Sequence, residues 1–240
     1  MPIDPFLLLR AYAIGVFPMS DDRDDEEVYW VEPRKRAILP LDRFHLSRSL
    51  ARTLRAERFR VSVDEDFAGI VRLCAQAAPD RPTTWINHEI ERSYRRLHEL
   101  GFAHSVECWE GADLVGGLYG VALGRAFFGE SMVSRRTDAS KVALAWLVAR
   151  MRASGMHLLD CQFMTDHLRS LGAVEIDQRD YQSLLGSALA GVELGDESAL
   201  LSEGPGSAAA LAFAPDFSAA LSVSGPVSGQ VISQLLTQTS

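Results

Sequence analysis

The most constraining feature of this chain is a run of three strand-like segments, followed by a long helix and one more strand. The strand-like segments cover residues 103–109, 114–123 and 126–133, and residues 110–113 and 124–125 between them have turn composition. Connections this short join antiparallel neighbours, so we expect an antiparallel meander.

The segments on either side of the meander extend the pattern. An apolar helical repeat over residues 139–153 begins after Thr137 or Asp138 and ends before Gly155, and a strand over 157–162 and a short helix over 166–171 follow. Before the meander, residues 59–64 predict a strand, and residues 66–77 and 86–100 predict helices. A strand, a crossover helix and a second strand are expected to lie parallel. The sequence therefore predicts an α+β fold with a mixed, mainly antiparallel sheet.

This order of elements resembles the fold of the Gcn5-related N-acetyltransferases. In that fold the fourth and fifth strands splay apart and leave a cleft between them. Glu130 lies on the fourth predicted strand, and Asp160 and Gln162 lie at the carboxyl end of the fifth, where open α/β sheets bind their ligands. Residues 160 and 162 are expected on one face of their strand.

Length and composition suggest how the chain is divided. A chain of 240 residues, 47% of them hydrophobic, can bury a full core. We expect a small N-terminal domain over residues 1–58, an acetyltransferase-like catalytic domain over 59–194 and a tail over 195–240. The tail is rich in Ala, Ser and Gly and contains no Lys or Arg, which favours disorder. A short apolar segment that docks, Val231 to Leu236, remains an alternative within it.

Several features bear on location and cofactors. The three cysteines fit neither a disulfide framework nor a paired zinc motif, and the six histidines have no zinc spacing. The apolar run that begins at Phe6 stops at Arg10, which is too short for a signal peptide or a membrane span. We expect a cytoplasmic monomer with no metal, no cofactor and no membrane contact.

The net charge of −8 disfavours nucleic-acid binding, but the charges are unevenly distributed. Residues 34–60 contain nine Lys and Arg against Asp42 and Glu57, a local balance of +7. Within this stretch, residues 45–55 predict a helix with leucines on one face and Arg48, Arg52 and Arg55 on another. From this segment alone, a solvated helix face and a phosphate-binding face are equally consistent with the pattern.

A series of motifs, in order from about residue 7 to about residue 185, resembles the leucyl/phenylalanyl-tRNA–protein transferases. The motifs are Ala11-Tyr12 with Gly15-Val16-Phe17-Pro18, Tyr29-Trp30 with Pro33-Arg34, His45-Leu46-Ser47-Arg48-Ser49, Thr84-Trp85-Ile86, Leu97-His98-Glu99-Leu100-Gly101, Ala103-His104-Ser105-Val106-Glu107, Leu114-Val115-Gly116-Gly117-Leu118-Tyr119-Gly120-Val121, Gly129-Glu130-Ser131-Met132, Ala139-Ser140-Lys141, Leu159-Asp160-Cys161-Gln162 and Ser170-Leu171-Gly172-Ala173. The resemblance implies transfer of Leu or Phe from charged tRNA to the N-terminal Arg or Lys of acceptor proteins. That modification marks the acceptors for degradation under the N-end rule.

The resemblance also implies roles for individual catalytic residues. Asp160 is expected to orient the amide of Gln162, which accepts a hydrogen bond from the attacking amine, and Glu130 is expected to hold the basic side chain of the acceptor. A glutamine is a poor base, so a carboxylate or a hydroxyl of the adenosine remains an alternative proton acceptor. Considered without the family, Glu130 would pair with Arg125 or Arg135, and Asp160 would cap a helix or end a strand.

Substrate-binding residues follow from the same resemblance. The acyl pocket is expected to be lined by Leu118, Phe127, Gly129 and Leu159, and the terminal adenosine to stack on Tyr12 and Trp85. Contacts to tRNA phosphates are expected from Arg34, Lys35, Arg48, Arg52 and Arg55. On periodicity alone, the apolar positions are ordinary core residues.

Two other functions remain possible from the sequence. A small-molecule or protein N-acetyltransferase would share the fold, but its cofactor pyrophosphate needs a glycine-rich turn before the long helix. Here that turn reads Ser134-Arg135-Arg136-Thr137-Asp138. A non-catalytic tRNA-binding module would account for the basic segment and leave Glu130, Asp160 and Gln162 without a role.

Overall fold

The computed structural model describes residues 2–77, 83–192 and 228–237. Its main sheet has seven strands in the order β4 (Arg60–Val63), β5 (Ala103–Glu110), β6 (Asp113–Leu123), β7 (Ala126–Ser134), β8 (Leu158–Gln162), β3 (Lys35–Ile38) and β9 (Val174–Asp177). The pair β7 and β8 is parallel and the other neighbours are antiparallel. The α+β class, the mixed sheet, the meander and the parallel pair predicted from the sequence are therefore confirmed.

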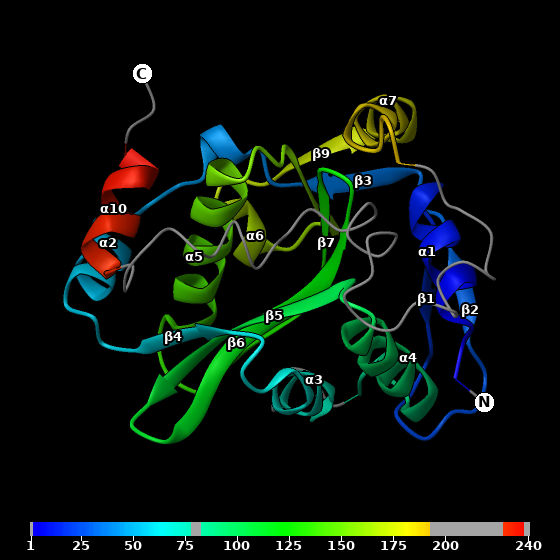
Figure 1. Cartoon of the computed structure of the whole chain (residues 1–240), viewed down its shortest axis with the longest axis horizontal. Coiled ribbons are helices and arrows are strands. Elements are labelled where there is room, and N and C mark those ends of the chain that lie inside the picture. Colours follow the sequence, from blue (N-terminus) through cyan, green and yellow to red (C-terminus); the bar gives the residue numbers. More distant parts are fainter. Residues whose placement is uncertain (1, 78–82, 193–227, 238–240) are drawn as a thin grey trace.

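Helices cover both faces of this sheet (Figure 1). On one face lie α3 (Phe67–Ala75) and α4 (His88–Glu99), and on the other lie α5 (Ala139–Ala153) and α6 (Asp166–Ser170). Successive side chains of a strand point to opposite faces, so Leu118 joins the core around α5 while Tyr119 joins the core around α3 and α4. The sheet is thus buried between two apolar layers.

The N-terminal region contributes directly to the main sheet. Helix α1 (Pro5–Ala13) and a small sheet of β1 (Phe17–Met19) and β2 (Tyr29–Val31) precede β3, which inserts between β8 and β9. Helix α7 (Gln178–Ala188) packs on the same edge. A domain boundary at residue 58 is therefore wrong, because it would cut β3 away from the sheet to which it belongs.

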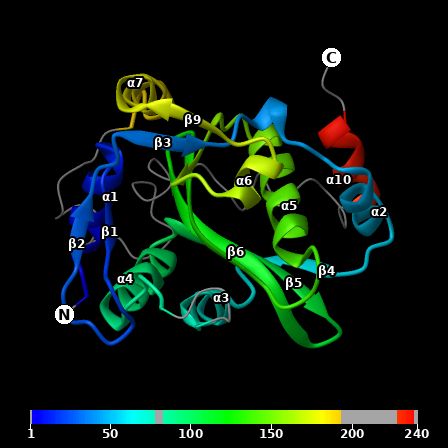
Figure 2. The ribbon, with the colours of Figure 1, turned by 180° about the vertical axis from the view of Figure 1, so that it is seen from behind.

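Two short helices lie side by side at the end of the molecule farthest from α1 (Figure 2). The predicted basic helix is α2 (Arg48–Arg55), and it begins after Ser47, whose hydroxyl accepts from the Leu50 amide. Helix α10 (Gly229–Thr237) packs against it. Disorder was therefore the wrong expectation for residues 229–237, and the docked apolar segment is confirmed. Residues 195–227 and 238–240 of the predicted tail lie outside the described residues.

The described part of the chain contains no helix long and apolar enough to cross a membrane. It also contains no group of three His, Cys, Asp or Glu side chains arranged to hold a metal ion.

Candidate active site

The site begins where β7 and β8 separate. Their parallel pairing ends with Phe128 opposite Asp160, after which β7 continues to Ser134 while β8 ends at Gln162. Gln162 has a φ of 54°, a left-handed conformation that residues other than glycine rarely adopt. This turn out of the strand places Gln162 across from Glu130 on the neighbouring strand.

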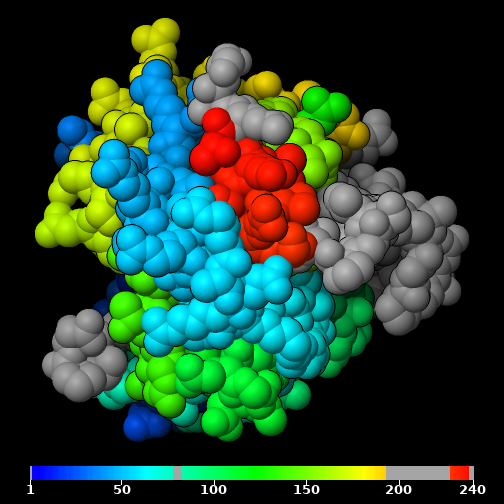
Figure 3. Space-filling view, turned by 90° about the vertical axis from the view of Figure 1, so that its left-hand side faces the viewer, coloured from blue at the N-terminus to red at the C-terminus, as the bar shows by residue number. Residues whose placement is uncertain are grey.

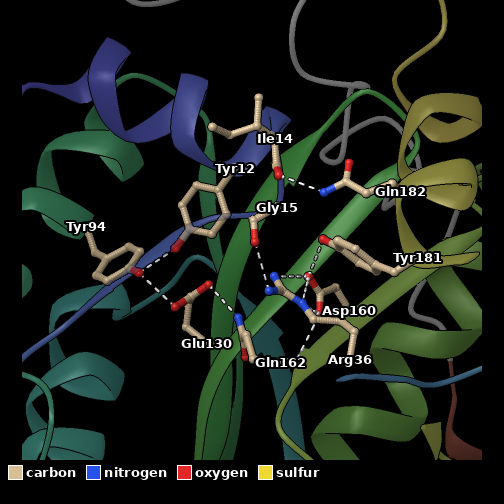
Figure 4. Close-up of polar contacts among 10 residues, drawn as sticks. All are labelled: Tyr12, Ile14, Gly15, Arg36, Tyr94, Glu130, Asp160, Gln162, Tyr181 and Gln182. Carbon is tan, nitrogen blue, oxygen red and sulfur yellow. Dashed lines mark hydrogen bonds and ion pairs between the residues drawn. The ribbon is translucent and has the colours of Figure 1, made fainter. Parts of the chain in front are cut away.

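A buried ion pair supports the end of β8 (Figure 4). Nε of Arg36 lies 2.9 and 3.0 Å from the two Asp160 carboxylate oxygens, and Nη2 lies 2.6 Å from one of them. Nη1 donates to the Gly15 carbonyl at 2.9 Å, and the guanidinium lies between the rings of Phe17 and Tyr181. Burial alone would lower the pKa of Arg36, but the Asp160 carboxylate raises it above its ordinary value. Arg36 therefore belongs to this site and not to the basic surface predicted around it.

Asp160 holds the main chain of Gln162. One carboxylate oxygen accepts from the Gln162 amide N–H at 2.8 Å, and the other accepts from the Tyr181 hydroxyl at 2.8 Å. The side-chain amide of Gln162 instead donates to Glu130. Asp160 is therefore bound to the backbone of Gln162 and not to its side-chain amide, and its role in orienting that amide stays a prediction.

Glu130 lies in a chain of buried hydrogen bonds. Its Oε1 accepts from Nε2 of Gln162 at 2.9 Å, and its Oε2 accepts from the Tyr94 hydroxyl at 2.7 Å. The Tyr94 hydroxyl also contacts that of Tyr12. Burial raises the pKa of Glu130 to about 7, against the lowering effect of the tyrosine hydrogen bonds. Among the described residues it forms no ion pair with an arginine.

Tyr12 cannot stack a base in this structure. Its side chain is fully buried, its ring centroid lies 4.8 Å from that of Phe128, and its hydroxyl points to Tyr94. The stacking prediction for Tyr12 is therefore wrong, because the ring has no face open to solvent. Trp85 is half-buried and lines the cavity described next, and its stacking role stays a prediction.

A cavity of about 410 Å³ opens beside Glu130 and Gln162. Its walls include Phe17, Met19, Trp85, Leu118, Gly129, Met132, Leu144, Leu147, Leu159, Phe163, His167 and Leu168. A Cβ added at Gly129 would come no closer than 3.5 Å to another residue. Phe127 does not line this cavity; its side chain is fully buried in the core that it shares with Leu118 and Leu159, and its ring lies against Gly120. The acyl-binding role of Leu118, Gly129 and Leu159 stays a prediction.

Sequence reasoning missed Arg36, Tyr94 and Tyr181 as parts of the site. Tyr94 is visible only as an apolar position on a helix, because its hydroxyl contact depends on where α4 meets β7. The available signal for Arg36 is its position directly before the apolar run Ala37-Ile38-Leu39. A charged residue at the edge of a buried strand needs a partner, and sequence alone does not identify that partner.

The predicted phosphate contacts are exposed. Arg48, Arg52 and Arg55 lie on the solvent side of α2, and Arg34 and Lys35 lie at the start of β3. Their role in tRNA binding stays a prediction.

Comparisons with known proteins identify the family of this chain. The family model "Leucyl/phenylalanyl-tRNA protein transferase" matches residues 38–186, and that of its N-terminal domain matches residues 1–34. The match to the N-terminal domain model ends at residue 34, before strand β3.

Relatives that carry the same name span nearly the whole chain. Proteins called leucyl/phenylalanyl-tRNA–protein transferase are 59% identical in Rhizorhabdus wittichii and 52% identical in Novosphingobium aromaticivorans, each over 99% of this chain and over 99% and 97% of their own lengths. One from Zymomonas mobilis is 62% identical over 78% of this chain and 70% of its own. A solved structure, L-PGS from Bacillus licheniformis, matches at 13% identity with a TM-score of 0.37 over 67% of this chain and 53% of that one, too low to inform the fold. The chain belongs to the leucyl/phenylalanyl-tRNA–protein transferase family.

Proposed function

We propose that this chain transfers leucine or phenylalanine from charged tRNA to the N-terminal Arg or Lys of acceptor proteins, which marks them for degradation. The observation that carries the proposal is the buried Glu130–Gln162 pair beside a mainly apolar cavity. The proposal includes action in the cytoplasm, as a monomer and without a cofactor. It also includes a fold of the Gcn5-related acetyltransferase type, supported by the divergence of β7 and β8 after their parallel pairing.

The reaction is aminolysis of an ester that is already activated, so the protein mainly positions its two substrates. Nε2 of Gln162 donates to Glu130, so the amide oxygen Oε1 of Gln162 points away from that carboxylate. We assign this Gln162 oxygen as the acceptor for the attacking α-amine. An N-terminal α-amine has a pKa near 8 and is partly neutral at physiological pH. The neutral amine has already lost one proton before it attacks. When the amide forms, the nitrogen loses another, and this proton passes to the departing adenosine oxygen.

Glu130 is suited to bind the basic side chain of the acceptor. Because burial raises its pKa to about 7, the empty site holds a carboxyl group that is partly protonated near neutrality. An arriving guanidinium or ammonium favours the ionised form, since an opposite charge lowers the pKa of a nearby acid. An N-terminal alanine offers no such charge.

Asp160 and Arg36 are positioning residues in this proposal. Both side chains are almost completely buried, and Asp160 acts through the main-chain N–H of Gln162. Removing either one is expected to release the left-handed turn that points the Gln162 amide at Glu130.

The cavity is suited to the donor amino acid. Leu118, Gly129 and Leu159 form part of an apolar wall that accepts the side chains of Leu and Phe, which are unbranched at Cβ. Trp85 offers a ring for the terminal adenosine, a contact that tolerates any base. The exposed Arg34, Lys35 and the arginines of α2 supply charge for the tRNA phosphates.

The acetyltransferase alternative has less support at the N-terminus of α5. The residue before that helix is Asp138, whose carboxylate lies 3.6 Å from Nζ of Lys141. A carboxylate at this position opposes the binding of pyrophosphate, which needs free N–H groups and positive potential. The tRNA-binding module alternative leaves the hydrogen-bonded chain from Tyr12 to Gln162 without a function.

The test uses purified protein, phenylalanyl-tRNA or leucyl-tRNA, and a peptide that begins with arginine. We expect a mass gain of one Phe or Leu residue, and no gain on a matched peptide that begins with alanine. No gain with either donor would contradict the proposal. An acetyl gain with acetyl-coenzyme A as donor would support the acetyltransferase instead.

A further inference from the structure

Helix α10 is seated on the opposite end of the molecule from the N-terminal sheet. Its residues at positions i, i+3, i+4 and i+7, namely Gly229, Ile232, Ser233 and Leu236, are buried. They pack against α2 and α5. Figure 3 shows α10 in red lying directly against α2 in cyan. The family models end at residue 186, so α10 lies beyond the part of the chain that they match.

Polar contacts fix both ends of α10. The Gly229 N–H donates to Oε1 of Glu57 at 3.2 Å, just after α2, and Nη1 of Arg152 on α5 donates to the Leu235 carbonyl at 3.0 Å. Gly229 lies so close to α2 that an added Cβ would fall 2.0 Å from the Leu54 carbonyl oxygen. Helix α10 is therefore held at a specific place against α2.

Helix α2 depends on such support. It has eight residues, and an isolated helix of that length is not stable in water. The inner face of α2 packs on the protein through Leu50, Ala51 and Leu54, and α10 packs against α2 beside it. Its outer face carries Arg48, Arg52 and Arg55. Both α5 and α10 pack against α2, and these contacts hold the backbone that carries the three arginines.

We propose that α10 is a positioning element for tRNA binding, which holds α2 so that its arginines meet the phosphates of the donor tRNA. This inference rests on the proposed function. Residues 229–237 contain no Lys, Arg, Asp or Glu, so α10 adds no charge of its own. Its effect on tRNA passes through α2, and it has no part in the chemistry at Glu130 and Gln162.

The variant Gly229→Ala tests the proposal with a single added methyl group. That methyl overlaps main-chain atoms of Leu54, so α10 must move away from α2. Gly186→Ala on α7 is the matched control, because a Cβ there meets nothing within 4 Å. Ile232→Ala, which removes buried apolar contact without a clash, serves as a second variant in case Gly229→Ala does not fold.

Two donors separate tRNA binding from chemistry. One is phenylalanyl-tRNA, and the other is the phenylalanyl ester of adenosine, which has the reacting bond and the base but no phosphate. For Gly229→Ala we expect KM for phenylalanyl-tRNA to rise about tenfold and its dependence on salt to weaken, as for the loss of phosphate contacts. We expect kcat, and both constants for the adenosine ester, to match the parent and Gly186→Ala.

Two results would overturn the inference. An equal loss of activity with both donors would show that α10 supports only the general stability of the fold. Unchanged kinetics with both donors in Gly229→Ala and Ile232→Ala would show that its seat on α2 does not matter. A parent protein that is inactive with both donors is a different outcome, because it would refute the proposed function itself.

Discussion

Replacing Arg36 with methionine is expected to lower the free energy of unfolding by about 3–5 kcal/mol, the usual loss when one partner of a buried ion pair is removed. Arg36 is 1% exposed and Asp160 is fully buried, so water cannot solvate the remaining carboxylate. Asp160 keeps its hydrogen bonds from Tyr181 and from the main chain of Gln162, but neither donor carries a charge. The Gly15 carbonyl also loses its donor.

Urea unfolding of four proteins tests this reasoning: the parent, Arg36→Met, Asp160→Leu and the double variant. The double variant is expected to be more stable than Arg36→Met, because it removes the unpaired buried charge. Arg96→Met is the control, since its exposed pair with Glu99 contributes little. Two results would refute the argument. In one, the losses of unfolding free energy in the two single variants simply add in the double variant; in the other, Arg36→Met is as stable as Arg96→Met.

Three further predictions concern the carboxylate, the adenosine contact and the glycines of the sheet. Burial raises the pKa of Glu130 to about 7 from its ordinary 4.5, so the protonated carboxyl stabilises the folded parent below pH 4.5, and this contribution is lost as the pH rises through 7. In urea unfolding from pH 4.5 to 8, Glu130→Gln is expected to remove this decline in the free energy of unfolding. An identical decline in the parent and the variant would contradict the prediction. Trp85→Ala is expected to raise KM for the phenylalanyl ester of adenosine roughly 5- to 160-fold, from the 1–3 kcal/mol typical of base stacking; an unchanged KM in the transfer assay would exclude stacking. Gly120→Ala is expected to lower Tm because its Cβ falls 2.2 Å from the Phe128 carbonyl oxygen, whereas Gly129→Ala leaves Tm unchanged, and equal Tm values would contradict the geometry.

Most of the fold was predictable because its strands and helices have strong local patterns. The meander, α5 and the parallel strand β8 have clear periodicity and clear turn residues between them, so their order and pairing follow from the sequence. Strand β3 was not predicted, since Arg34, Lys35 and Arg36 give it a charged start typical of a surface segment. Helix α10 is amphipathic, but it follows a low-complexity stretch whose composition dominated the prediction.

The candidate site was predictable as a set of positions and less so as a set of contacts. Glu130, Asp160 and Gln162 do come together, because the topology places their strands side by side. The direction of each side chain depends on tertiary partners: Arg36 captures the Asp160 carboxylate, and Tyr94 turns toward Glu130. Tyr12 was assigned to a base from the family resemblance, and the sequence could not correct this because aromatic residues serve both surfaces and cores.

The left-handed backbone at Gln162 leads to a final prediction about stored strain. A residue with a Cβ pays about 1–2 kcal/mol to adopt this conformation, whereas glycine does not. Gln162→Gly is therefore expected to be more stable than Gln162→Ala by about 1 kcal/mol, although both variants lose the amide that faces Glu130 and with it peptide transfer.

The same pair of substitutions at Ser183, an exposed position inside α7, provides the control. There the order should reverse, because glycine is less stable than alanine in a helix by about 1 kcal/mol. If Gln162→Gly were also less stable than Gln162→Ala, the turn would not be strained. The opposite order at the two positions would show that the protein gives up stability at the left-handed turn that ends β8, from which the Gln162 amide reaches Glu130.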